Sequence, residues 1–219
     1  MKKLIIFGTG DFAKLAKFYF ENDSDYSISA FTVEKNFFKE DKFCDVPCYE
    51  FENIEKIFSP DEYEMFIAVG YTKINKVRAE IYQKAKEKGF KLANYISSKS
   101  IYWNNKIGDN CFIFEGCVIQ PDAVIGNNNI IWSGSIISHD SIIGNNCFLA
   151  PGVTIAGFVK IENYCFLGAG CTIRNGIQIA QECIIGAGVT IINNTESGEV
   201  YKTPDPVLLN INSNEIKNF

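Results

Sequence analysis

The second half of the chain repeats with a period of six residues. An isoleucine or a leucine occupies every sixth position from residue 101 to residue 191 without a break. Small or modest side chains follow many of these aliphatic residues at the fourth position, and glycines recur directly after them or three residues after them. A short, fixed repeat predicts a solenoid in which each unit packs only on its neighbours. The repeat therefore constrains this half of the chain more than any other feature.

Each hexad predicts a short strand followed by a corner. The aliphatic residue points into the interior, and the residue two positions before it also points inward, where a narrow prism leaves room only for small groups. Glycines supply the backbone freedom that corners need. Because three hexads close one coil, the pattern predicts a parallel β-helix of about five coils.

The chain contains eight cysteines and one histidine, His139. Eight cysteines can indicate a disulfide framework or a metal site. The apolar stretch after Lys2-Lys3 ends at Gly8, too soon for a signal peptide, so we expect a cytoplasmic protein with reduced thiols. We expect most of the cysteines to pack as small apolar groups, with no metal bound, because six of them occupy the inward small-residue position. These are Cys111, Cys117, Cys147, Cys165, Cys171 and Cys183.

One outer face of the predicted β-helix is apolar along its whole length. The residue before each aliphatic points outward, and on this face, at a spacing of eighteen residues, it is always phenylalanine or isoleucine. The stripe consists of Phe112, Ile130, Phe148, Phe166 and Ile184. Such a stripe is a liability on a soluble monomer. We therefore predict that it forms the interface of a homotrimer, and the alternative is that the N-terminal domain docks on it.

Residues 1–97 differ in kind and predict a small Rossmann-like α/β domain with a mainly parallel sheet. The expected strands are 3–7, 26–33, 46–51, 64–69 and 91–95, and the expected helices are 11–20 and 72–88. The β-helix then covers 98–195, and 196–219 is expected to be a C-terminal tail. The net charge of −5 argues against a nucleic-acid partner. No apolar run reaches the ~18 residues of a membrane span.

The first strand leads into a glycine-rich turn, Gly8-Thr9-Gly10-Asp11-Phe12-Ala13, and Glu34 ends the second strand. Taken literally, this is a dinucleotide-binding fingerprint. A domain of this size holds little more than one mononucleotide-binding half, however. We therefore predict a mononucleotide or nucleotide-sugar site, and a tight strand–helix turn without a ligand stays as an alternative.

The histidine lies at a predicted corner, in Ser138-His139-Asp140, and should project out of the prism. An imidazole can accept a proton from an amine or a hydroxyl at physiological pH, and a neighbouring carboxylate can orient it. His139 and Asp140 are therefore candidate catalytic residues, with a solvated corner residue as the alternative. A single histidine nearly excludes a zinc enzyme with three histidine ligands.

The order of these features resembles the PglD/NeuD group of bacterial sugar acetyltransferases. The most specific parts are His139-Asp140, the following Ile143-Gly144, and Ala156-Gly157. Ile67-Ala68-Val69-Gly70 before the second long helix also fits. The resemblance implies a left-handed β-helix, a trimer and acetyl-CoA as the acyl donor.

The resemblance also implies roles for individual residues. His139 would be the general base oriented by Asp140, the N–H of Gly157 would hold the thioester carbonyl, and CoA would lie near Ala169 and Ala187. The N-terminal domain would bind the nucleotide of a UDP- or dTDP-linked amino sugar. The residues implied there are Gly8, Gly10, Asp11, Glu34 and Gly70.

The sequence departs from the family pattern mainly at the acceptor site. Thr9-Gly10-Asp11-Phe12 replaces the usual Ser-Gly-His-Gly, and Phe148 stands where a second histidine is common. The acetyl-transfer residues therefore carry over better than those for the acceptor. The main alternative is O-acetylation of a sialic-acid-like sugar. Alternatives of other classes are a nucleotide-binding oxidoreductase and a non-catalytic trimeric scaffold.

Overall fold

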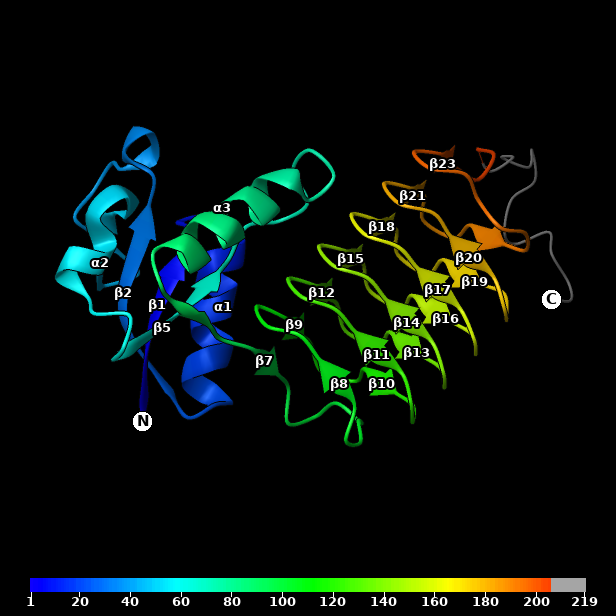
Figure 1. Ribbon diagram of the computed structural model, residues 1–219, viewed down its shortest axis with the longest axis horizontal. Coiled ribbons are helices and arrows are strands. Elements are labelled where there is room, and N and C mark those ends of the chain that lie inside the picture. The colour runs from blue at the N-terminus through cyan, green and yellow to red at the C-terminus, as the bar shows by residue number, and fades with distance from the viewer. Residues whose placement is uncertain (206–219) are drawn as a thin grey trace, which may run out of the picture.

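A computed structural model describes residues 1–205, in which an α/β domain is followed by a β-helix (Figure 1). The remainder of the predicted tail, 206–219, lies outside the described residues. The left-handed β-helix fold with a small N-terminal α/β domain, expected from the sequence, is confirmed. The division near residue 97 stays a prediction.

The N-terminal domain is built on a six-stranded sheet with the order β3-β4-β2-β1-β5-β6. All its neighbouring strands are parallel except the β3–β4 pair. The strands are β1 (Lys2–Phe7), β2 (Tyr26–Val33), β3 (Lys42–Phe43), β4 (Val46–Glu50), β5 (Tyr63–Ile67) and β6 (Lys91–Leu92). The nearly continuous apolar runs of β1 and β5 suit strands that are buried on both faces.

Helices cover both faces of this sheet. The apolar residues of α1 (Asp11–Asn22) pack on one face, and those of α2 (Ile54–Ile57) and α3 (Lys76–Glu87) pack on the other. Short 3₁₀ turns occupy Lys35–Phe37 and Phe51–Asn53. The helix expected over 72–88 begins only at Lys76, because Lys73, Ile74 and Asn75 have positive φ angles of 51°, 53° and 63°.

The β-helix has three faces, each a ladder of two-residue parallel strands, which we name after one strand. The β10 face contains β10 (Val118–Ile119), β13 (Ile136–Ile137), β16 (Thr154–Ile155), β19 (Thr172–Ile173) and β22 (Thr190–Ile191). The β8 face contains β8 (Lys106–Ile107), β11 (Val124–Ile125), β14 (Ile142–Ile143), β17 (Lys160–Ile161) and β20 (Gln178–Ile179). The β9 face contains β7 (Tyr95–Ile96), β9 (Phe112–Ile113), β12 (Ile130–Ile131), β15 (Phe148–Leu149), β18 (Phe166–Leu167), β21 (Ile184–Ile185) and β23 (Val200–Tyr201).

Two segments join the β9 face that the sequence does not place there. The strand expected over 91–95 divides into β6, which pairs with β5, and β7, which pairs with β9. The first part of the expected tail forms β23, which pairs with β21. The β-helix is therefore longer at both ends than its regular hexads, because edge strands recruit neighbouring chain to satisfy their backbone groups.

The inward small residues do more than fill the prism. Three cysteine thiols of one column lie near the backbone oxygen fifteen residues later: Cys111 Sγ to Gly126 O (3.1 Å), Cys147 Sγ to Glu162 O (3.1 Å) and Cys165 Sγ to Ala180 O (3.2 Å). Asn129 and Ser141 make the same contact with stronger donors. Burial raises the pKa of the Cys111 thiol to about 12, so this thiol is inert. All eight cysteines are free.

Most of the apolar stripe is covered by the chain's own N-terminal domain, which corrects the predicted interface there. Phe112, Ile130 and Phe148 are buried in one core together with residues of α1 and of the sheet. The rings of Phe12 and Phe112 lie 5.5 Å apart, and Tyr71 contacts both Phe148 and Phe166. Most of the stripe is thus an intramolecular docking surface, which was the alternative to a trimer interface, while Ile184 at its end is half-buried outside this core.

Candidate active site

His139 lies at the edge between the β10 and β8 faces, at the corner that joins β13 to β14. Its side chain is 50% exposed, and its Nδ1 lies 2.9 Å from Oδ2 of Asp140. The backbone is held on both sides: the N–H donates to Oε1 of Gln120 (3.0 Å), and the carbonyl accepts from the N–H of Phe158 (3.1 Å). In the tautomer that donates from Nδ1 to the carboxylate, Nε2 carries a free lone pair.

Gly157 lies one coil further along the same edge, directly against the imidazole. A Cβ atom at this position would come within 2.8 Å of both Cε1 and Nε2 of His139. Its carbonyl accepts from the N–H of Gly176 (3.0 Å), and its own N–H has no acceptor within residues 1–205. The edge therefore presents a proton acceptor and a free backbone donor side by side.

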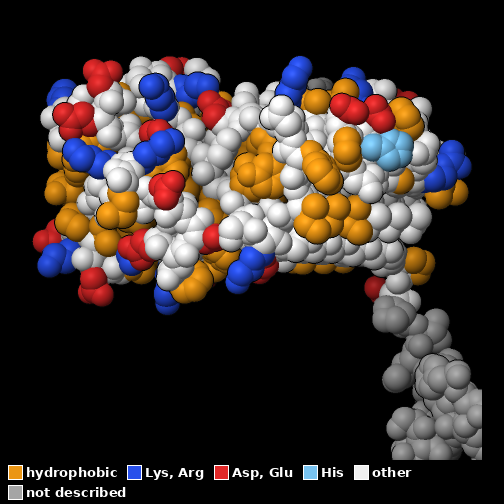
Figure 2. Space-filling model, turned by 90° about the horizontal axis from the view of Figure 1, so that it is seen from below, with side chains coloured by type: hydrophobic (Ala, Val, Ile, Leu, Met, Phe, Trp, Pro, Cys, Tyr) orange, Lys and Arg blue, Asp and Glu red, His pale blue; other side chains and the backbone are white. Residues whose placement is uncertain are grey.

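Apolar side chains surround this edge. Phe158 is 58% exposed and its ring lies edge-on to His139 at 5.1 Å. Ile136 and Ile142, on the strands either side of the histidine, are also exposed. Figure 2 shows the histidine at the surface of the β-helix with acidic and hydrophobic side chains around it.

Ala169 and Ala187, the residues expected near CoA, lie on a different edge of the prism. This edge joins the β9 face to the β10 face, and the two alanines stack on successive coils, with the N–H of Gly188 donating to Ala169 O (2.9 Å). Both side chains are exposed. The β10 face therefore separates these alanines from His139 within one chain.

The expected nucleotide site is partly assembled at the carboxyl ends of β1, β2 and β5. Gly8, Gly10 and Glu34 line a cleft of about 250 Å³, together with Thr9, Ala68 and Val69. Gly8 has a φ of 119°, and a Cβ there would lie 2.8 Å from Ala68 O, so only glycine fits this turn. An adjoining cavity of about 500 Å³ is lined by Lys39, Glu40, Lys42 and Phe43, among others.

The other residues expected at this site behave differently. Asp11 occupies the first turn of α1, and neither Asp11 nor Gly70 lines the two cavities. Glu34 pairs with Lys84 (2.8 Å), and this hydrogen bond raises the pKa of Lys84 above its usual range. Gly70 O accepts a hydrogen bond from Arg78 (2.6 Å). Sequence reasoning missed Arg78, because an arginine at a helical position usually faces solvent.

Residues 1–205 contain no cluster of three or more His, Cys, Asp or Glu side chains placed to hold a metal ion. Over the same range, every helix is too short or too polar to cross a membrane.

Comparison with known proteins identifies both halves of the chain. Residues 3–85 match the PglD N-terminal domain family, and four overlapping segments over 106–193 match the bacterial transferase hexapeptide family. No curated protein sequence matches the chain.

Solved structures match nearly the whole chain. PerB from Caulobacter crescentus, solved with CoA and GDP-perosamine, superposes with a TM-score of 0.80 at 24% identity over 91% of this chain and 93% of its own. The acetyltransferase domain of PglB from Neisseria gonorrhoeae, solved with acetyl coenzyme A, gives 0.80 at 20% identity over 91% and 95%. WeeI from Acinetobacter baumannii gives 0.75 at 19% identity over 91% and 96%. At these identities the likeness shows the fold. The chain thus combines a PglD N-terminal domain with a bacterial transferase hexapeptide domain, and the resemblance to the PglD/NeuD group is confirmed.

Proposed function

We propose that this protein is an acetyl-CoA-dependent acetyltransferase that acetylates an amino group of a nucleotide-linked amino sugar. The observation that carries the proposal is the edge at His139, where an imidazole oriented by Asp140 lies against the free N–H of Gly157. The molecules bound in two similar structures support the proposal: PerB was solved with CoA and GDP-perosamine, and the PglB domain with acetyl coenzyme A.

The reaction follows from these groups. Nε2 of His139 accepts a proton from the attacking amine as its nitrogen bonds to the thioester carbonyl carbon of acetyl-CoA. The negative charge that develops on the carbonyl oxygen is stabilised by the N–H of Gly157, a fixed dipole. The tetrahedral intermediate then expels the CoA thiolate, which takes the proton from the imidazolium. No covalent enzyme intermediate is needed, so the buried cysteines play no chemical part.

The N-terminal cleft is the proposed site for the nucleotide. Its glycine-rich turn leads into the N-terminus of α1, where backbone N–H groups and the helix dipole favour phosphate. UDP or dTDP is the nucleotide expected from the sequence, and PerB adds GDP to the nucleotides to be tested. A cytoplasmic location belongs to the same proposal, because eight free cysteines suit a reducing compartment.

We propose a homotrimer with an interface different from the one first predicted. The exposed Ile136, Ile142 and Phe158 form an apolar patch around His139 that a neighbouring subunit would cover. In a closed ring, one edge of each copy meets a different edge of the next. The Ala169 and Ala187 edge of a neighbour would then face His139 and complete the acetyl-CoA site.

The deciding experiment is an assay of acetyl transfer to UDP-, dTDP- and GDP-linked amino sugars, measured by release of free CoA thiol. We expect the His139→Asn variant to lose activity by a factor on the order of 10²–10⁴, because the general base is removed. Gln181→Ala, an exposed corner residue on another edge, serves as the matched control and should keep wild-type activity. Wild-type rates in His139→Asn would refute the mechanism. Transfer only to free sialic-acid-like sugars would favour the O-acetyltransferase alternative, and a failure to bind acetyl-CoA would favour a scaffold.

A further inference from the structure

Arg78 is a buried cation without a carboxylate partner. Its side chain is fully buried, and no Asp or Glu of residues 1–205 forms a salt bridge with it. Desolvation lowers its pKa to about 10, so it remains charged at neutral pH. Burying a charge is costly unless hydrogen bonds compensate for the lost water. Hydrogen bonds to carbonyl and amide oxygens must therefore compensate for the burial of this charge.

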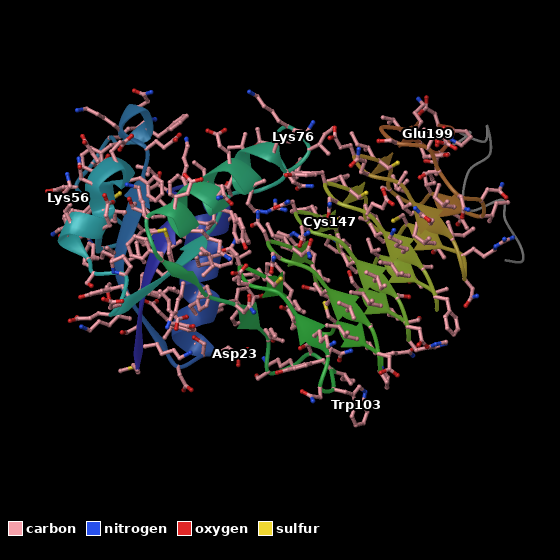
Figure 3. All side chains as sticks on the ribbon, viewed as in Figure 1. Asp23, Lys56, Lys76, Trp103, Cys147 and Glu199 are labelled. Carbon is pink, nitrogen blue, oxygen red and sulfur yellow. The ribbon has the colours of Figure 1, made fainter. Side chains whose placement is uncertain are left out.

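The guanidinium joins the loop after β5 to the β-helix. Nη1 donates to Gly70 O (2.6 Å) and to Asn75 Oδ1 (3.0 Å). Nη2 donates to Cys147 O (3.0 Å) and Asn128 O (3.2 Å), on two successive coils. Cys147, labelled in Figure 3, marks the place where the β-helix meets α3. A single side chain thus fixes the loop with respect to two coils.

The loop itself has an unusual backbone. Lys73, Ile74 and Asn75 are three consecutive residues in the left-handed region, and such a conformation is especially unfavourable for a β-branched residue such as Ile74. The loop keeps it because Asn75 is fully buried and its Nδ2 donates to Cys165 O (3.2 Å). Strain of this kind persists where the surroundings over-determine the backbone and is concentrated at functional sites.

The same contacts leave a row of backbone donors free. Because every peptide bond of the described chain is trans, the N–H of Tyr71 points away from Arg78 when the Gly70 carbonyl points towards it. Within residues 1–205, none of the N–H groups from Val69 to Thr72 has an acceptor, and neither do those of Thr9 and Gly10. Thr9, Gly10 and Val69 line the same cleft. Successive free N–H groups form anion-binding sites.

We propose that Arg78 is a positioning residue for the nucleotide diphosphate. It holds the loop after β5 in place through the Gly70 carbonyl, so that the free N–H of Val69 and those of Thr9 and Gly10, which line the same cleft, bind the diphosphate together. Its charge, which has no carboxylate partner, is then balanced in part by the phosphates when the acceptor binds. This inference rests on the proposed function of the cleft.

The test compares a nucleoside diphosphate with its nucleoside by calorimetry, using UDP, dTDP and GDP with uridine, thymidine and guanosine. For Arg78→Met we expect about tenfold weaker binding of the diphosphate, equivalent to ~1.4 kcal/mol. The affinity for the nucleoside and the KM for acetyl-CoA should not change. The matched control is Lys86→Met, which removes another contact between α3 and the β-helix, Lys86 Nζ to Asp109 Oδ2 (2.8 Å), at the far end of the helix.

The outcomes separate this inference from the proposed function. Equal losses for diphosphate and nucleoside in Arg78→Met, or an unchanged diphosphate affinity, would overturn the positioning role while leaving the nucleotide site in place. Wild-type protein that binds none of the three diphosphates would overturn the nucleotide site as well. Where Arg78→Met does not fold, Arg78→Lys provides the same comparison. It keeps the charge but cannot reach all four carbonyl and amide oxygens, so a severalfold loss for the diphosphate alone is expected.

Discussion

At the scale of single residues, the corner position of His139 and its acidic neighbour Asp140 follow from the sequence, but the geometry of the site does not. The hexad register predicts an outward imidazole next to a carboxylate. The structure adds that Asp140 adopts a left-handed conformation, with a φ of 56°, and that its carboxylate reaches Nδ1. Short polar side chains tolerate this conformation better than most. The contact with Gly157 depends on how successive coils stack, which only the folded chain defines.

Gly157→Ala tests the closeness of the histidine and the glycine. The added Cβ would lie 2.8 Å from two atoms of the imidazole, so the half-exposed ring must rotate away. We expect kcat to fall on the order of 10²-fold, because the misplaced base no longer meets the amine. Thermal melting should change little, since the ring has solvent to move into. A Gly157→Ala variant with wild-type kcat would show that catalysis does not require the imidazole of His139 to lie against residue 157.

At the scale of elements, α1 is connected at its C-terminal end to the start of the β-helix. Asp23 accepts hydrogen bonds from Tyr95 Oη (2.7 Å), Ser97 Oγ (3.2 Å) and the Ser98 N–H (3.0 Å). Burial alone would raise the pKa of Asp23, but these hydrogen bonds outweigh it and lower the pKa from 3.8 to about 2. A negatively charged aspartate at a helix C-terminus interacts unfavourably with the helix dipole. Asp23 therefore stabilises the fold through its hydrogen bonds to the start of the β-helix.

The lowered pKa of Asp23 predicts how the stability of the protein depends on pH. The folded state favours the ionised carboxylate, so its stabilisation is complete above about pH 4 and is lost as the pH falls towards 2. Asp23→Asn should lower the melting temperature at pH 7, and the difference from wild type should shrink between pH 4 and pH 2. Thermal denaturation followed by circular dichroism measures this difference. Asp25→Asn, at an exposed neighbour, is the control and should show no such trend.

At the scale of the whole molecule, the N-terminal domain and the β-helix share one core. Most of the face that the sequence offers as a subunit interface is covered by α1 and by Tyr71 of the same chain. The edge at His139 keeps exposed apolar side chains, and the Ala169 and Ala187 edge lies across the β10 face. The molecule as described therefore places the two halves of the expected acetyl-CoA site on separate edges.

The proposed trimer can be tested at the edge beside His139. Ile142 is 47% exposed on β14. Its replacement by aspartate should dissociate the trimer, because a charge would be desolvated at an apolar contact. Sedimentation velocity should then report a folded monomer with little acetyl transfer. Ile57→Asp, at an exposed isoleucine of α2, is the matched control and should stay trimeric. A fully trimeric Ile142→Asp protein would place the interface elsewhere.

The hexad repeat by itself determined the β-helix, the inward direction of the cysteines and the outward direction of His139, because a period of six fixes which way each side chain points. The glycine-rich turn likewise predicted the cleft at Gly8 and Gly10, and at Gly8 only glycine fits the backbone. Tertiary structure alone decided what covers the stripe that contains Phe112 and what surrounds Arg78. A periodic pattern defines a face but does not say which surface packs on it. That choice depends on contacts between residues far apart in the sequence, and these form only when the two domains meet.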